Sequence, residues 1–221
     1  MLIFRFEWKR KRKYILIWAA ALAVCIFSMT PVYYGMIETA DALPAGFTQG
    51  GFFETVGVSL ELLMEPLGMY SFLTGFFMIA GGVFGMHLGL SLYTGECTEN
   101  TAEYLYTKPC GRRTIFIGKL LCAIAGVCVT GISYLLASFF TMELFQPGFS
   151  TGEFLLVASS FILLTLFFAL LGLTVGIFHP NNRSPLLTAG LVVFVEYCIT
   201  SFSRTVSIRA IGFLSPFSFF S

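Results

Sequence analysis

The residues that could carry out chemistry are few in this sequence of 221 residues. There are only two histidines, no His-Glu-x-x-His or Gly-x-Ser-x-Gly motif, and no carboxylate cluster of the metal-site type. Gly118-Lys119 is similar to the end of a phosphate-binding loop, but the spacing before it is wrong and Leu120 follows where Ser or Thr is required. We therefore expect no catalytic, cofactor-binding or metal-binding residue here, and no enzyme activity in this chain by itself.

The cysteines are expected to be free thiols. None forms a Cys-x-x-Cys pair, and four of the six lie in apolar segments. Such residues are usually small buried hydrophobes rather than metal ligands or disulfide partners. They are Cys25, Cys97, Cys110, Cys122, Cys128 and Cys198.

A polar segment between two apolar stretches has the clearest pattern. Glu96, Glu99 and Glu103 are spaced by three and four residues, so a helix would place them in one acidic stripe with apolar side chains on another face. Pro109 would end that helix. The pattern predicts a short amphipathic helix over residues 96–108. It is either a docking surface for a partner or a solvated loop helix without one.

Two ionisable residues lie inside apolar stretches. A charge in lipid is unfavourable, so Glu196 should face protein or water. It either lines a translocation path for a polar or cationic substrate, or it is protonated or paired with Arg204 or Arg209. His87 is either a packing residue or a participant in transport.

The elements that carry these residues are expected to be membrane helices. The chain is 57% hydrophobic and only 11% charged, whereas a soluble domain carries about 25% charged residues. A spanning helix needs about 20 apolar residues. The sequence therefore predicts a single all-α transmembrane domain over residues 1–221, a polytopic helix bundle whose five visible spans are 14–36, 70–93, 120–142, 154–178 and 184–203.

The C-terminal stretch leaves two interpretations open. Residues 211–221 are apolar but too few to span a membrane. Either a sixth span lies at or beyond the C-terminus, or this segment is re-entrant.

The distribution of basic residues predicts the orientation. Lys and Arg gather before the first span, between the second and third, and between the fourth and fifth, whereas the loops after the first and third spans have none. By the positive-inside rule the N-terminus and residues 96–108 are cytoplasmic. Arg204 and Arg209 do not fit this pattern. The net charge of +1 gives no reason to expect a nucleic-acid partner.

The segments that flank the spans have patterns of their own. Leu2 and Phe6 are four residues apart, as are Phe4 and Trp8, and basic residues crowd the end of this segment. Residues 1–13 are therefore expected to form an amphipathic helix in the membrane interface, or else a frayed basic tail. A helix is also expected over residues 52–63 in the outer loop. Lys119 is expected to extend toward the lipid headgroups.

Glycines recur every four residues in two of the expected spans. Gly81, Gly85 and Gly89 do so in the second span, and Gly172 and Gly176 in the fourth. Small residues at this spacing let helices approach closely. They serve either packing within the chain, or a seam between two chains or a flexible wall of a path.

The polar segment also resembles a known family. The order Glu99, Thr101, Ala102, Glu103, Leu105, Thr107, Pro109 and Arg112, followed by Ile115 and Gly118-Lys119, is similar to the signature of type-2 (ABC-2) ABC transporter permeases. Asn100 stands where that family often has Gly, and Gly111 where it often has Ser. The layout is also similar, since members have an elbow helix before the first span, this motif between spans two and three, and six spans.

The resemblance implies a function. In such transporters the segment is a coupling helix that docks on a separate ATPase, which holds ATP and Mg, and two permease subunits pair as a homodimer or heterodimer in the cell membrane. Export is the implied activity. The implied docking residues are Glu96, Glu99, Thr101, Glu103, Tyr104, Leu105, Pro109 and Arg112.

Two other classes compete with this interpretation. A self-contained secondary transporter or channel tends to show internal repeats and several buried charges, whereas this chain has one buried glutamate and no clear repeat. A membrane-embedded enzyme or a sensor anchor would need a catalytic or sensing constellation, which the sequence lacks.

Overall fold

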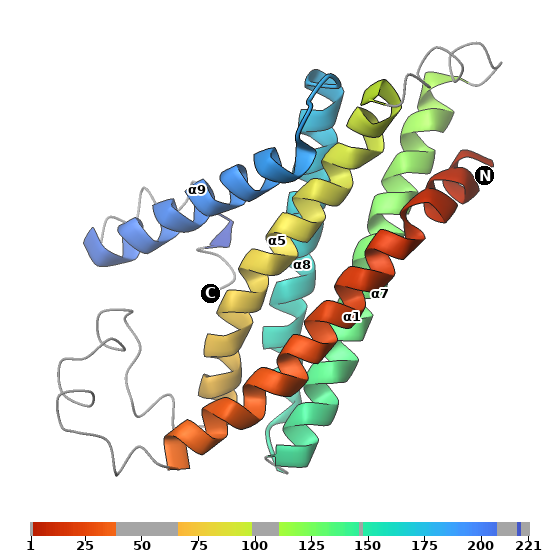
Figure 1. The fold of residues 1–221 in the computed structure, drawn as a ribbon. Coiled ribbons are helices and arrows are strands. Elements are labelled where there is room, and N and C mark those ends of the chain that lie inside the picture. Colours follow the sequence, from red (N-terminus) through yellow and green to blue (C-terminus); the bar gives the residue numbers. More distant parts are fainter. Residues whose placement is uncertain (1, 39–65, 99–110, 146–147, 207–215, 218–221) are drawn as a thin grey trace.

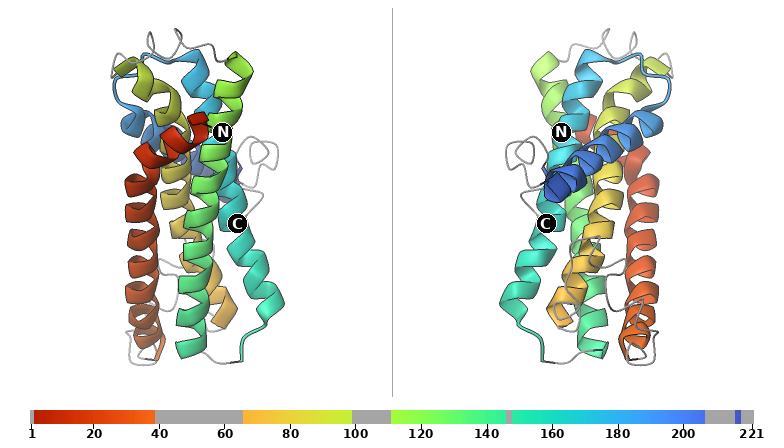
Figure 2. Two further views of the ribbon diagram at one scale, coloured as in Figure 1. Left: turned by 90° about the vertical axis from the view of Figure 1, so that its right-hand side faces the viewer. Right: turned by 90° about the vertical axis from the view of Figure 1, so that its left-hand side faces the viewer.

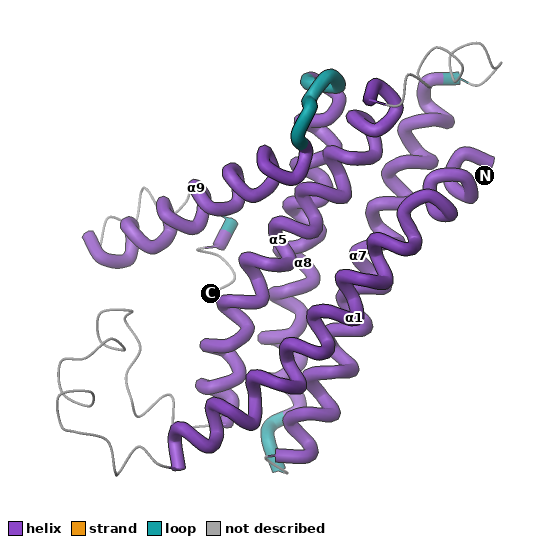
Figure 3. The backbone as a smooth tube through the Cα atoms, viewed as in Figure 1, coloured by secondary structure: helices purple, strands orange, loops and turns teal. Residues whose placement is uncertain are grey.

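A computed structural model describes residues 2–38, 66–98, 111–145, 148–206 and 216–217. Within them the chain is an all-α bundle without strands, as Figure 3 shows. Each of its five helices is long and apolar enough to cross a membrane. They are α1 (Leu2–Glu38), α5 (Pro66–Thr98), α7 (Arg112–Phe145), α8 (Thr151–Phe178) and α9 (Pro185–Val206).

The predicted spans fall on these helices, apart from Ser184, which precedes α9, and the helices extend beyond them. The second span was expected to end at residue 93, and the helix that carries it, α5, continues to Thr98. The third span was expected to begin at residue 120, and its helix, α7, begins at Arg112. The prediction counted only the apolar residues, whereas backbone hydrogen bonding carries a helix past them into polar sequence. As a result Glu96 belongs to the last turn of α5. Residues 99–108 and the predicted helix at 52–63 lie outside the described residues.

Four helices run side by side and α9 crosses them obliquely (Figures 1 and 2). The first turns of α1 bend away from the axis of the rest, although the helix is continuous from Leu2. Residues 2–13 are thus helical, and their position in the membrane interface stays a prediction. The surface of the helices is apolar: Phe178 is 75% exposed and Leu156 70%. Such a surface suits lipid tails.

The closest helix contact joins α5 and α8. A Cβ atom at Gly85 would lie 2.4 Å from the backbone oxygen of Thr165, and one at Gly89 would lie 2.2 Å from that of Ala169. In return, a Cβ atom at Gly172 would lie 2.3 Å from the backbone oxygen of Met86. No real side chain fits at these distances. The glycine pattern therefore serves packing within the chain, the first of the two interpretations.

A second pair is formed by α1 and α7. Gly118 faces the side chain of Ile3, Gly126 faces that of Ile15, and Ser133 donates a hydrogen bond of 3.3 Å to the backbone oxygen of Ala19. These contacts follow each other along parallel helices. They place the N-terminal helix against a helix more than a hundred residues later in the chain.

Aromatic side chains fill the space between the two pairs. Tyr134 of α7 is fully buried and stacks on Phe161 of α8, with ring centroids 4.0 Å apart. Phe217, from the end of the chain, is 3% exposed and lies against Phe168 and Tyr197. The chain therefore returns to the bundle after α9, as the re-entrant interpretation expects for that residue. Among the described residues there is no sixth spanning helix.

The α5–α8 contact gives a direct test. Gly89→Ala should lower the thermal stability of the protein in detergent, because overpacking a tight contact costs about 1–3 kcal/mol. Gly75→Ala on the same helix is the matched control, since a Cβ atom there meets nothing within 4 Å. Ala favours helices over Gly, so the control should be neutral or stabilising. Equal melting temperatures for the two variants would contradict the close contact of α5 with α8 at Gly89.

Candidate functional site

The segment predicted to dock a partner connects α5 to α7. Glu99, Thr101, Glu103, Tyr104, Leu105 and Pro109 all lie outside the described residues. The structure defines the ends of this segment: Glu96 in the last turn of α5, and Arg112 as the first residue of α7, exposed at its surface. We refer to this end of the bundle as the α5–α7 end. The N-terminus and the connection from α8 to α9 lie there too (Figure 1).

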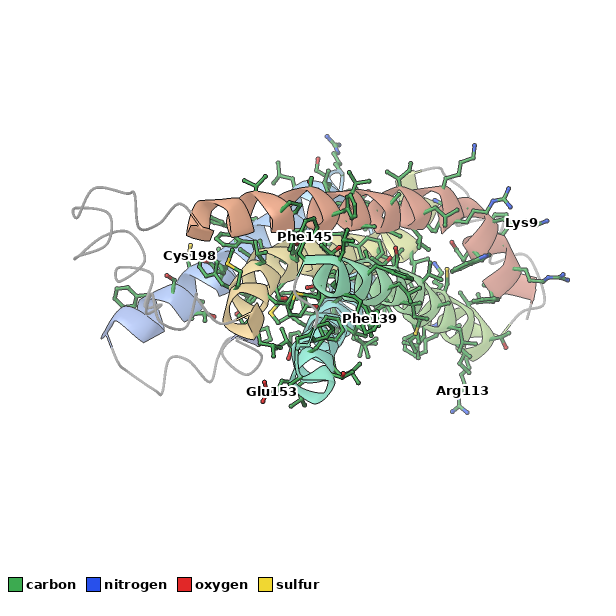
Figure 4. The ribbon with its side chains drawn as sticks, turned by 90° about the horizontal axis from the view of Figure 1, so that it is seen from below. Lys9, Arg113, Phe139, Phe145, Glu153 and Cys198 are labelled. Atoms are coloured by element: carbon green, nitrogen blue, oxygen red, sulfur yellow. The ribbon has the colours of Figure 1, made fainter. Side chains whose placement is uncertain are left out.

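The start of α7 is held by its own backbone. The amide groups of Thr114 and Ile115 donate to the oxygen of Gly111, at 2.9 and 3.3 Å. Arg112 and Arg113 stay exposed, and Figure 4 shows Arg113 pointing away from the helices. These hydrogen bonds hold the first turn of α7, so the residue that follows the predicted docking segment, Gly111, is fixed to the helix.

Lys119 is a correction to the sequence analysis. Expected to reach toward lipid headgroups, it is instead fully buried. Its ammonium group donates to the backbone oxygen of Leu92 on α5 at 2.5 Å, and it lies 4.2 Å from the ring centroid of Tyr93. A buried ammonium needs such partners, because burial without them is costly. Periodicity could not reveal this, since the partner is a backbone carbonyl of another helix.

The first turns of α1 pack onto this end of the bundle. Phe4 and Trp8 contact a buried cluster that includes Leu92 and Cys122, and Glu7 is only 1% exposed. The rings of Phe4 and Trp8 stack 6.1 Å apart, whereas Phe6, from the other predicted pair, is 61% exposed.

The basic residues of the same segment mostly face outward. Arg5, Lys9, Arg12 and Lys13 are exposed, and Figure 4 shows Lys9 projecting from the helix. Arg10 differs, because its guanidinium group lies against Gly95: a Cβ atom there would lie 2.2 Å from a guanidinium nitrogen. The N-terminal helix therefore contacts the last turn of α5, which leads into residues 99–110.

His87 lies between α5 and α1. Its Nδ1 atom is 2.7 Å from the hydroxyl oxygen of Tyr14, and the two rings are 4.9 Å apart. Tyr14 also stacks on Phe84. These contacts support the packing alternative for His87, while a part in transport stays a prediction.

Glu196 lies on α9, and its side chain is partly buried. Its backbone oxygen accepts a hydrogen bond of 3.1 Å from the hydroxyl of Thr200 one turn later. The side chain of Arg204 and all of Arg209 lie outside the described residues. The two predicted path residues therefore sit in different places, with His87 facing α1 and Glu196 on α9.

The connection from α8 to α9 is a compact turn at the same end of the bundle. Asn182 accepts from the amide of Ser184 at 3.0 Å and donates to the hydroxyl of Thr188 at 2.7 Å. Pro185 then occupies the first position of α9, where a proline suits a helix start. Within the described ranges no three metal-ligating side chains gather, and Cys25, Cys122, Cys128 and Cys198 are free thiols.

Comparison with known proteins decides the family. A family model described as ABC-2 family transporter protein matches residues 1–214, nearly the whole chain. The chain belongs to this family. No curated protein and no solved structure matches it.

Membership in the ABC-2 family makes this chain a multi-pass membrane permease of an ABC transporter. The resemblance inferred from the order of residues between Glu99 and Lys119 is thereby confirmed. Permeases of this family are membrane components that associate with ABC ATPase subunits and are not themselves catalytic.

Lys119 gives the prediction of this section. Lys119→Met keeps the length of the side chain but removes the donor to Leu92, and losing a buried charged hydrogen bond costs about 1.5–3 kcal/mol. The melting temperature in detergent should fall. Lys13→Met is the control, because Lys13 is exposed and should tolerate the change. A Lys119→Met protein as stable as the Lys13→Met protein would show that the buried contact contributes nothing.

Proposed function

We propose that this ABC-2 permease is the membrane subunit of an exporter whose ATPase is a separate chain that docks on residues 96–112. The family match carries the proposal. The acidic stripe of Glu96, Glu99 and Glu103 could pair with basic residues of the ATPase, while Leu105 and Tyr104 fill an apolar groove on it.

The surroundings of the segment support this role. Residues 99–110 connect two long helices, and both helix ends are fastened to the rest of the bundle. Lys119 ties α7 to α5, and Arg10 lies against Gly95. A load on the segment would therefore act on helices that run the length of the bundle rather than on a loose loop. Such a connection is what an energy-coupling element requires.

The proposal includes the rest of the assembly. Two permease subunits, identical or different, would form the membrane core, with ATP and Mg held by the ATPase subunits. The N-terminus and the α5–α7 end would face the cytoplasm of the cell, in keeping with the exposed Arg5, Lys9, Arg12 and Arg113 there.

Co-purification tests the docking site. An ABC ATPase should come down with the wild-type protein from native membranes, and the triple variant Glu99→Ala, Glu103→Ala, Leu105→Ala should lose it. Removing a few central contacts from an interface commonly weakens binding by about 2 kcal/mol or more. Mass spectrometry of the purified sample measures this.

The matched control removes two acids elsewhere. Glu143→Ala, Glu153→Ala changes exposed residues at the other end of α7 and the start of α8, and should retain the ATPase. If gentle detergent yields no ATPase even with the wild type, a self-contained carrier or channel becomes the better interpretation. If both variants lose it equally, residues 99–105 are not the docking site.

We further propose that Glu196 lines the translocation path. Its place on an apolar helix, partly buried, is the reason, since ionisable residues inside membrane helices commonly mark the pathway of a substrate or ion. Glu196→Gln should reduce export about tenfold while leaving the amount of protein in the membrane unchanged. Unchanged export, measured in cells or vesicles, would remove Glu196 from the path. His87→Gln tests the other predicted path residue in the same assay.

A further inference from the structure

The contacts inside the bundle are of two kinds. Between α5 and α8, backbone meets backbone: the Cβ positions of Gly85, Gly89 and Gly172 all fall within 2.4 Å of a main-chain oxygen on the other helix. The glycines come from both helices, so the two backbones interlock. Neither helix can slide or turn on the other without a main-chain clash, because packed interiors leave no room for it.

The helix α9 belongs with this pair. It packs on α5, and Val193 lies 3.2 Å from the Cβ position of Gly82. On the other side of the bundle, α1 follows α7 through contacts at Gly118, Gly126 and Ser133, spread over the length of both helices. We call these two groups the α5–α8 pair and the α1–α7 pair.

The contacts between the pairs are made by side chains. They include Lys119 with the oxygen of Leu92, His87 with Tyr14 at 2.7 Å, and the hydroxyl groups of Thr74 and Tyr134 at 2.9 Å. Each joins α5 to α1 or α7. The helix α7 also packs on α8, where Tyr134 stacks on Phe161. The packing of α5 on α8 and of α1 on α7 is nevertheless more extensive than any contact between the pairs.

Side-chain contacts can rearrange where backbone contacts cannot. Long side chains change rotamer and exchange partners during small shear movements of packed helices, whereas interlocked backbones move as one body. The contacts between α1 and α7 are also made by side chains, but they run along both helices and are more extensive than any contact between the pairs. The weak plane of this molecule therefore lies between the pairs. Residues 99–110 cross that plane, because they connect the end of α5 in one pair to the start of α7 in the other.

We propose that the α5–α8 pair and the α1–α7 pair are two bodies that move relative to each other when the docked ATPase acts on residues 99–110. This rests on the proposed function, since it takes the ATPase as the source of the movement. In this movement the contacts of Lys119, His87 and Tyr134 rearrange, whereas the glycine contacts between α5 and α8 stay as they are.

Paired cysteines test this in the complex of the permease with its ATPase, with the native cysteines replaced. Two pairs cross the plane: Leu88→Cys with Gly126→Cys, where the Cβ position of Gly126 is 2.7 Å from the Leu88 side chain, and Ile162→Cys with Gly131→Cys, at 2.8 Å. In each pair, replacing the larger side chain, Leu88 or Ile162, with Cys also makes room for the Cβ atom added at the glycine. The atoms nearest the glycines are Leu88 Cδ2 and Ile162 Cγ1, two bonds and one bond from Cβ, so a small movement of the helices brings the two Cβ atoms of each pair into the range of a disulfide.

Two control pairs stay within one body. Tyr93→Cys with Gly176→Cys joins α5 to α8, with a Cβ–Cβ distance of 3.2 Å, and Ile3→Cys with Gly118→Cys joins α1 to α7, at 3.1 Å. Each sample is its own reference, because ATP hydrolysis is measured in the reduced complex, after oxidation, and again after re-reduction. The rate of disulfide formation is measured with and without ATP plus vanadate.

The expected result separates the two kinds of pair. ATP plus vanadate should change the rate of disulfide formation at least about fivefold for a crossing pair, and oxidation should block ATP hydrolysis until the disulfide is reduced. The control pairs should form disulfides at unchanged rates and keep hydrolysis.

Two contrary results are distinguishable. If an ATPase is present and active but crossing pairs and control pairs behave alike, the two-body inference is wrong while the proposed function stands. If no ATPase accompanies the reduced permease, the proposed function is wrong, and the inference falls with it.

Discussion

Helices in a bilayer gain little by burying apolar side chains, because lipid tails are as apolar as the protein interior. They associate through close packing and through polar contacts between them. In this chain the approach of α5 to α8 supplies the closest packing, at glycines that bring main-chain atoms into contact. The remaining elements take their places around it: α9 lies on α5, the aromatic residues around Tyr134 fill the space beside α8, and the α1–α7 pair joins through polar side chains.

The sequence predicted most of this fold. Apolar length gave all the described helices, and the four-residue spacing of Gly81, Gly85 and Gly89 identified a close-packing face. Spacing could not say which helix the glycines meet, since a neighbour in the same chain and a second chain impose the same pattern. The helices α5 and α7 extend several residues beyond the predicted apolar spans, because hydropathy marks where apolar side chains stop and not where backbone hydrogen bonding stops.

The sequence predicted which family the candidate site belongs to, but not how the neighbouring residues are packed around it. The order of residues from Glu99 to Lys119 identified the ABC-2 family, which the match over residues 1–214 established. The burial of Lys119 was missed, because a lysine at the start of a span ordinarily extends to the membrane surface. Its acceptor, a main-chain oxygen of Leu92, leaves no signature in sequence. The contact of Arg10 with Gly95 could likewise not be predicted from the sequence, since it depends on how α1 bends.

The pairing of α1 with α7 has a consequence for biogenesis. Ser133 bonds to Ala19 across a separation of 114 residues, and a ribosome takes on the order of ten seconds to add that many. During that interval α1 has been made and inserted, while its partner has not been translated. Glu7, which ends up almost fully buried, must wait in the headgroup region or against the insertion machinery. The helix α1 is thus synthesised well before the helix it packs on, and the assembling protein depends on its environment to hold α1 until α7 arrives.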